Sequence, residues 1–382
     1  MPRIVGGILT LLLALPAAGA QDKDKGPDGP DKAATPAQQY QALLKEFNEQ
    51  MRLYQQAVKG KTPEEQQKLY QEKYPKRNTL APKFVELAEK NPTDPVAVSA
   101  LVWVLRDPVR VQPLGGKDWK ARAVELLMRD HVQSEAIGVA CMLLGNSVDR
   151  PTEKLLRTVM DKNPHKNAQA QACLALAQLL DQRARLAKLA KENPNLAQQI
   201  ENIVGKEMHE ELKKADLAKI EAETAAVYKD LADKYLADMT ADHLTSLMQR
   251  LSFSGGASSE TLLRSILEKD KRHDVQGQAC LYLGQAVKKR GDDLTTGDAK
   301  QIAKLHAEAE AILERAAKEF GDVKTFRNTT IADQVKRELF DLRNLAVGKS
   351  APDVEAEDQD GRKFKLSDYK GKVVLLDFWS QF

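Results

Sequence analysis

The sequence predicts a mainly α-helical protein, an α-solenoid of helical hairpins followed by a short α/β segment near residue 382. Apolar residues recur at steps of three and four from about residue 37 to residue 346, which is the period of one helix face. One stretch repeats at a constant offset of 107 residues. Charged residues make up 30% and aromatic residues 5% of the chain, which suits exposed helices better than a large β core.

The first 20 residues have the features of a cleavable secretory signal. Arg3 supplies the positive end, residues 4–15 the short apolar core, and the Ala-Gly-Ala of residues 18–20 a cleavage site. Because the apolar core is too short to cross a bilayer comfortably, we expect no membrane span after cleavage. The expected location is the periplasm or the extracellular space. Residues 21–36, rich in Lys, Asp, Gly and Pro, are predicted to form a disordered linker.

The helical-repeat domain is predicted to span residues 37–346. Its first apolar stripe comprises Tyr40, Leu43, Phe47, Met51, Tyr54 and Val58. Thr62-Pro63-Glu64-Glu65 combines an N-cap, a first-turn proline and a capping-box glutamate, and therefore predicts a helix start. Asp94-Pro95 and Arg150-Pro151 predict further starts.

The internal repeat aligns residues 155–176 with residues 262–283 without a gap. A fainter copy covers residues 124–143, and residues 100–103 resemble the end of a fourth. Each unit is predicted to be a helix, a polar turn and a second helix. Such a pair cannot bury its apolar stripe alone, so the units are expected to stack, and they resemble tetratricopeptide or HEAT repeats. Stacked repeats present an extended surface, on which a protein partner is expected.

Each of the three cysteines follows an alanine at the same place in a repeat copy. They are Cys141, Cys173 and Cys280. Their number is odd and no two form a Cys-x-x-Cys pair, so we predict buried small thiols rather than a disulfide or a redox centre.

Residues 181–239, dense in Lys, Glu, Ala and Leu, lie between the two clearest copies. They predict a long charged helical arm, made of two long helices broken near Asn193-Pro194 and arranged as a hairpin or coiled coil. Their charge runs are interpreted as solvated faces.

Several function classes have no support in the sequence. Lys and Arg number 58 against 55 Asp and Glu, and no basic block interleaves with aromatics, so nucleic-acid binding is not expected. The six histidines are scattered, and Met208-His209-Glu210-Glu211 is not the His-Glu-x-x-His zinc motif. We therefore expect surface histidines, and neither a metal site nor a cofactor.

Residues 347–382 form a separate unit with β signals. Asp360-Gly361 lies between two short segments and predicts a hairpin, because glycine tolerates a positive φ. The apolar run of residues 373–379 predicts a strand. With the lead-in Val347-Gly348-Lys349-Ser350-Ala351-Pro352-Asp353 and the entry Ser367-Asp368-Tyr369-Lys370-Gly371-Lys372, the segment resembles the start of thioredoxin-like redoxins. Within these, it is most similar to the TlpA-type thiol-disulfide reductases, with AhpC/TSA redoxins as relatives.

This resemblance implies an incomplete thioredoxin-like α/β domain, with a hairpin and the central strand only. It also implies an exported thiol-disulfide oxidoreductase that acts on a protein disulfide or a thiol reductant. Asp377 matches the buried carboxylate that moves a proton for the second cysteine, which makes it the one candidate catalytic residue; the alternative is a polar residue at a strand end. Trp379-Ser380 replaces the Tyr-Pro typical of peroxiredoxins, which favours a reductase over a peroxidase with antioxidant activity.

The redox-active Cys-x-x-Cys of this family would begin after Phe382, so we expect the chain as given to be truncated and inactive. Three explanations stay open: an incomplete sequence, a nonsense mutation at a cysteine codon, or a UGA codon for selenocysteine. A function of another class also stays open. The chain would then be a helical-repeat scaffold for protein–protein interactions with a vestigial redoxin remnant.

Overall fold

The computed structural model describes residues 34–106, 118–254, 257–294, 299–325, 329–346, 349–358 and 360–377. The predicted signal peptide and most of the predicted linker lie outside the described residues, as do Trp379 and Ser380. Within the described part, no helix is both long enough and apolar enough to cross a membrane.

The described chain is mainly α-helical, as predicted, and its helices follow one another with short connections. They are α1 (Pro36–Val58), α2 (Pro63–Lys73), α3 (Arg77–Lys90), α4 (Pro95–Leu105), α5 (Trp119–Asp130), α6 (Ile137–Leu144), α7 (Arg150–Lys162), α8 (Lys166–Glu192), α9 (Ala197–Val204), α10 (Lys206–Lys214), α11 (Leu217–Lys234), α12 (Ala241–Ser254), α13 (Ala257–Lys269), α14 (His273–Asp292), α15 (Ala299–Phe320) and α16 (Ile331–Asn344).

The predicted helix starts are confirmed, and side-chain caps explain them. Thr62 accepts a hydrogen bond from the Glu65 amide at 3.3 Å, while Glu65 accepts one from the Thr62 amide at 2.9 Å. Asp94 caps α4, and Asp149 caps α7 by accepting the Thr152 amide at 2.8 Å. Each cap satisfies an amide that has no partner within its own helix.

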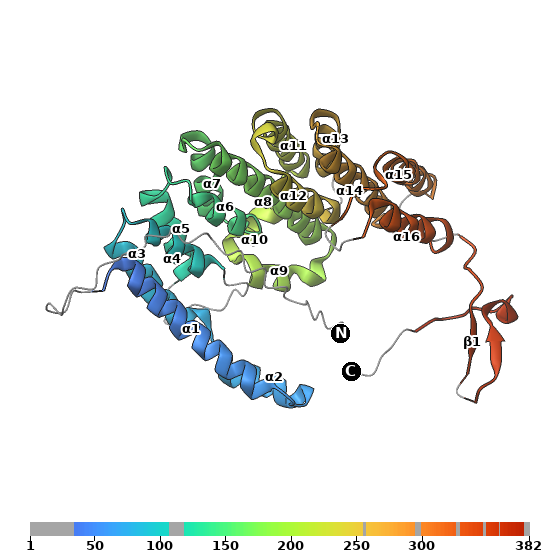
Figure 1. Cartoon of the computed structure of the whole chain (residues 1–382), viewed down its shortest axis with the longest axis horizontal. Coiled ribbons are helices and arrows are strands. Elements are labelled where there is room, and N and C mark those ends of the chain that lie inside the picture. The colour runs from blue at the N-terminus through green and yellow to red at the C-terminus, as the bar shows by residue number, and fades with distance from the viewer. Residues whose placement is uncertain are drawn as a thin grey trace.

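The helices stack as hairpins into a curved array (Figure 1). Successive pairs contact one another through a single buried cluster that runs from Phe47 in α1 to Leu342 in α16. At the N-terminal end, the rings of Phe84 and Trp103 stack with centroids 3.9 Å apart, and Phe47 meets Trp103 edge-on at 5.2 Å. Each helix pair therefore buries its apolar stripe against its neighbours, as expected for a solenoid.

The internal repeat corresponds to whole helices. At the offset of 107 residues, α7 coincides with α13 at both ends, and the starts of α8 and α14 coincide. The helix that packs next on each pair is α11 in the first copy and α15 in the second. The chain between α8 and α11 is longer than that between α14 and α15, because α9 and α10 occur only in the first copy.

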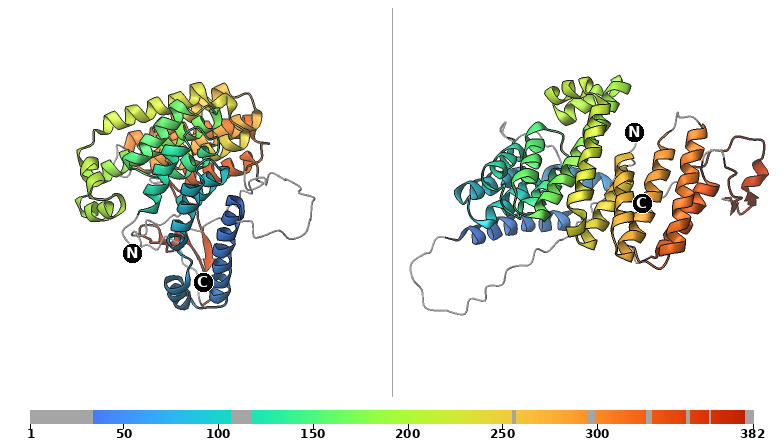
Figure 2. Two further views of the ribbon diagram at one scale, coloured as in Figure 1. Left: turned by 90° about the vertical axis from the view of Figure 1, so that its left-hand side faces the viewer. Right: turned by 90° about the horizontal axis from the view of Figure 1, so that it is seen from above.

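The predicted pair of long helices over residues 181–239 is wrong in its internal structure. The break near Pro194 is present, but α8 begins already at Lys166, and two short helices follow it before α11. Gly205, with a φ of +85°, separates α9 from α10. The segment folds back onto α8 and forms a second small core, to which Ile200, Met208 and Leu212 contribute. It projects from one side of the stack (Figure 2). Burial of these apolar residues favours two short helices packed on α8 over one long solvated helix.

The only sheet in the described part of the chain is a two-stranded antiparallel hairpin beyond α16 (Figure 1). Its strands are β1 (Glu355–Glu357) and β2 (Lys363–Lys365), and Ala356 pairs with Phe364. A mainly α protein with an incomplete α/β unit at residues beyond 346 is therefore confirmed. Its helical domain carries a large core, whereas the hairpin residues are mostly exposed.

Candidate functional site

The turn of the hairpin is organised by Asp358 and Gly361. The Asp358 carboxylate accepts hydrogen bonds from the amides of Asp360 and Arg362, both at 2.9 Å. The Gly361 amide donates to the Asp358 carbonyl at 3.0 Å, and Gly361 has a φ of +76°. The predicted Asp-Gly turn is thus confirmed, since a residue with a Cβ would be strained at this φ.

A second set of contacts holds the base of the hairpin. Asp353 accepts hydrogen bonds from the amide of Ser367 at 2.8 Å and from its hydroxyl at 2.7 Å. The Leu366 amide donates to the Val354 carbonyl at 2.9 Å. The hydrogen bonds from Ser367 lower the pKa of Asp353 from its ordinary value. Asp353 and Ser367 therefore join the two sequence pieces that carry the family resemblance.

The strand predicted over residues 373–379 is described only for residues 373–377, which form no strand and pair with none in the described part of the chain. A β ladder needs a neighbour on at least one side, and β1 and β2 pair only with each other. Val373 and Leu375 are 102% and 92% exposed. Asp377 is exposed as well, and its catalytic role stays a prediction.

The three cysteines are buried and free, as predicted. Burial raises the pKa of Cys141 and Cys173 to about 12 and that of Cys280 to about 11. Cys173 donates to the Val227 carbonyl in α11 at 3.4 Å, and Cys280 donates to the Ile312 carbonyl in α15 at 3.5 Å. These thiols are held as weak donors in helix packing and lack the thiolate that redox chemistry requires.

We expect the three native thiols to resist modification at pH 8. Because their pKa values lie about three to four units above this pH, the thiolate fraction is on the order of 0.1% or less. The measurement is thiol titration with DTNB, with and without guanidinium, in which three equivalents should appear only after unfolding. The variant Ser350→Cys, placed at an exposed position, provides the control and should add one rapidly reacting equivalent. Rapid labelling of the unmutated folded chain would contradict this assignment.

Comparison with known proteins agrees with the redoxin resemblance that the sequence of the C-terminal unit shows. Residues 347–382 match the AhpC/TSA family. A segment of 35 residues, 9% of this chain, is 51% identical to the thiol-disulfide oxidoreductase ResA of Geobacillus thermodenitrificans. The chain spans 20% of the length of that relative. No solved structure matches the chain significantly. The C-terminal unit is therefore redoxin-like, in agreement with its hairpin.

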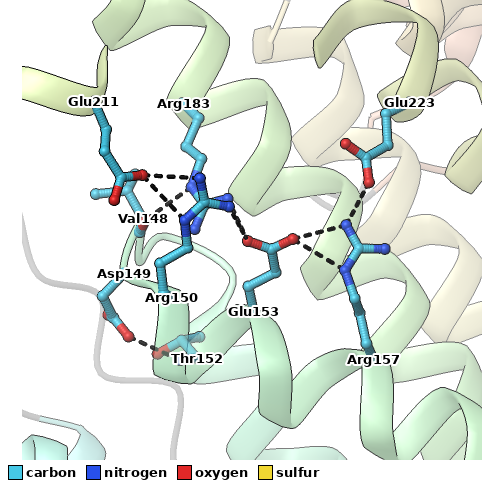
Figure 3. A network of polar contacts seen from close by, with 9 residues as sticks. All are labelled: Val148, Asp149, Arg150, Thr152, Glu153, Arg157, Arg183, Glu211 and Glu223. Carbon is cyan, nitrogen blue, oxygen red and sulfur yellow. Dashed lines mark hydrogen bonds and ion pairs between the residues drawn. The ribbon is translucent and has the colours of Figure 1, made fainter. Parts of the chain in front are cut away.

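The helical domain holds a charged cluster that the sequence did not predict (Figure 3). Glu153 in α7 lies between three arginines: it accepts from Arg157 at 2.8 and 3.0 Å, from Arg150 at 3.1 Å, and from Arg183. Arg183 also donates to the Val148 carbonyl at 2.8 Å. Burial would raise the pKa of Glu153, but hydrogen bonds from Arg157 and Arg183 outweigh it and hold the pKa at about 2.

Two further carboxylates connect this cluster to helices of the predicted arm. Arg150 bonds Glu211 of α10 at 2.8 Å, and Arg157 bonds Glu223 of α11. The interpretation of these charges as solvated faces is wrong for Arg183, whose side chain is 7% exposed. An arginine at this position of α8 is buried because α7 and the preceding loop close over it. The 107-residue repeat could have indicated this cluster, because its central charges recur in the second copy. Glu153, Arg157 and Arg183 correspond to Glu260, Arg264 and Arg290.

The expectation of surface histidines also needs correction. His131 and His209 are buried, at 6% and 3% exposure. Burial lowers the pKa of His131, so its neutral form is favoured. Among the described residues, no group of three or more His, Cys, Asp or Glu side chains is placed to hold a metal ion.

Proposed function

We propose that the protein is an exported thiol-disulfide oxidoreductase of the redoxin class, with the helical repeats placed before the catalytic domain. The observation that carries this proposal is the match of residues 347–382 to the AhpC/TSA family, together with the hairpin joined by Asp353 and Ser367. Export is supported by the signal-like residues 1–20. The ResA match favours a TlpA-type reductase over a peroxidase.

The proposed chemistry needs a nucleophile that the three buried cysteines do not provide. In a redoxin, the thiolate or selenolate of the first residue of the pair attacks one sulfur of a substrate disulfide. A mixed disulfide forms, and the other substrate sulfur leaves as a thiolate that takes a proton. The second cysteine then displaces the second substrate thiol and leaves the pair oxidised, until a dithiol donor reduces it. We place this pair in sequence that follows Phe382, with Asp377 as the group that moves the proton of the second cysteine.

Two properties of the 382-residue chain follow from this proposal. We expect it to be inactive in insulin reduction, because its own thiols are buried and of raised pKa. Residues 373–377 expose apolar side chains that a complete redoxin sheet would cover. The partners of the complete protein are proposed to be a protein disulfide and a thiol reductant.

The first test is the nucleotide sequence beyond codon 382. An in-frame cysteine or UGA codon, followed two codons later by cysteine and then by a redoxin-like frame, supports the proposal. A selenocysteine insertion hairpin just downstream of a UGA codon would identify the nucleophile as a selenol. A UAA or UAG stop codon at this position, with no redoxin-like reading frame downstream, would contradict the enzyme proposal.

The role of Asp377 is tested in the complete protein by Asp377→Asn. We expect the rate of insulin reduction to fall by about ten- to a hundredfold at neutral pH, because a positioned proton acceptor contributes about that much or more. The pH–rate profile should lose one ionisation. The matched control is Asp360→Asn in the hairpin turn, which should leave both unchanged. An unaltered rate and profile for Asp377→Asn would remove this residue from the mechanism.

A further inference from the structure

The charged cluster around Glu153 exists twice in the molecule. At the 107-residue offset, Glu260 and Arg264 in α13 and Arg290 in α14 take the places of its central residues. The outer carboxylate recurs too. Arg264 bonds Glu308 of α15 at 2.5 Å, as Arg157 bonds Glu223 of α11. The two copies therefore share their helix pairs and their central charges, although Ala257 stands in the place of Arg150.

The first copy is closed by the chain itself. Helices α9 and α10 pack against α8 in the turns that follow Arg183, with Met208 and Leu212 against Leu186 and Ala187. Arg183 is 7% exposed, and its Nε has the Val148 carbonyl as acceptor.

Among the described residues, the second copy has no counterpart of α9 and α10. Helix α14 ends at Asp292 and α15 begins at residue 299, so the chain has no room here for helices like α9 and α10. The side chain of Arg290 is 33% exposed, although its counterpart Arg183 is almost fully buried. Beside it lies a cavity of about 300 Å³ lined by Arg290, Leu294, Gln301, Lys304, Leu305 and Glu308.

The charges around this cavity are incompletely paired. Arg290 Nε and Glu260 Oε1 form an ion pair at 3.0 Å but are not aligned for a hydrogen bond, and Glu260 is 5% exposed. Burial raises the pKa of Glu260, and the nearby charge of Arg290 opposes this rise. Glu308 is already bonded to Arg264. Lys304 has no ion-pair partner among the residues that the structure describes.

We propose that this cavity binds a small ligand with a carboxylate group and an apolar portion. The guanidinium of Arg290 and the ammonium of Lys304 are the donors for the carboxylate, and charge-assisted hydrogen bonds of this kind are among the stronger ones. Leu294 and Leu305 provide the apolar wall. A cavity of this size lies at the small end of the range for small-molecule sites, and its lining combines two leucines with four polar or charged side chains. The carboxylate can come from a free acid or from a glutamate of a peptide.

The experiment is a saturation-transfer NMR titration of the full chain with hexanoate, with hexan-1-ol as the neutral match. We expect hexanoate to bind, and Lys304→Gln and Arg290→Gln to raise its Kd by about tenfold. The matched controls Lys336→Gln and Arg337→Gln lie on exposed positions of α16 and should leave the Kd unchanged. Because Arg290→Gln also removes the partner of Glu260, Lys304→Gln is the decisive variant.

A second arm distinguishes the two sources of the carboxylate. It uses the capped peptide Leu-Glu-Leu and its Leu-Gln-Leu counterpart. Binding of hexanoate that depends on Lys304 supports a free acid, and Lys304-dependent binding of the glutamate peptide alone supports a protein-borne carboxylate. The proposal is overturned if hexanol binds as well as hexanoate, if Lys304→Gln changes nothing, or if neither carboxylate binds.

Discussion

Replacing Glu153 with glutamine is expected to lower the free energy of unfolding by about 3–5 kcal/mol, because it leaves a buried arginine without its counter-charge. Arg183 is the residue affected, with its side chain 7% exposed and its guanidinium held by Glu153 and the Val148 carbonyl. Arg157 loses the same partner. Urea unfolding of the full chain, followed by circular dichroism, measures the change.

The matched control is Glu49→Gln in α1. Glu49 bonds Arg52 in the same helix, and both side chains are 53% exposed. An exposed pair of this kind contributes little to stability, because water and salt screen it, so the two variants should differ clearly. Equal effects for Glu49→Gln and Glu153→Gln would show that the cluster does not stabilise the fold.

The same cluster predicts an acid dependence. The pKa of Glu153 falls from an ordinary 4.5 to about 2 in the folded protein, so the unfolded chain binds the proton more readily. The stabilisation is fully present above about pH 4.5 and is lost as the pH falls toward about 2. The unfolding midpoint of Glu153→Gln should therefore depend less on pH across this window than that of the unmutated chain.

Replacing Phe84 with alanine is expected to lower the free energy of unfolding by about 3–5 kcal/mol, as for other fully buried aromatic residues. Phe84 is 0% exposed and stacks on Trp103 with centroids 3.9 Å apart, so its loss leaves a cavity that the array of helices cannot close fully. The change is measured by urea unfolding with Trp fluorescence, to which Trp103 contributes together with the two other tryptophans of the chain.

Phe340→Ala is the matched control, because Phe340 lies on α16 with half of its surface exposed. Its replacement should change the stability by less than about 1 kcal/mol. A loss for Phe84→Ala no larger than this would mean that α1, α3 and α4 do not share the packed core.

The sequence by itself determined the features that arise from local interactions. Capping residues such as Thr62 and Asp149 satisfy amides three residues away or fewer, so the helix starts could be predicted. The Asp-Gly turn is equally local. The 107-residue repeat also predicted where Cys173 and Cys280 would be buried, because equal apolar patterns stack in equal ways. The redoxin-like unit could be recognised from the order of its sequence motifs.

Only the tertiary structure decided how distant segments meet. The arm sequence permits long helices, and its folding back as α9 and α10 depends on apolar burial against α8. Arg183 and Arg290 occupy equal positions in the repeat, yet the side chain of Arg183 is 7% exposed and bonded to α7 and the loop before it, whereas that of Arg290 is 33% exposed and lines a cavity. Periodicity predicts which face of a helix is apolar, but burial of a charge depends on which neighbour covers it, and that neighbour lies far away in the sequence.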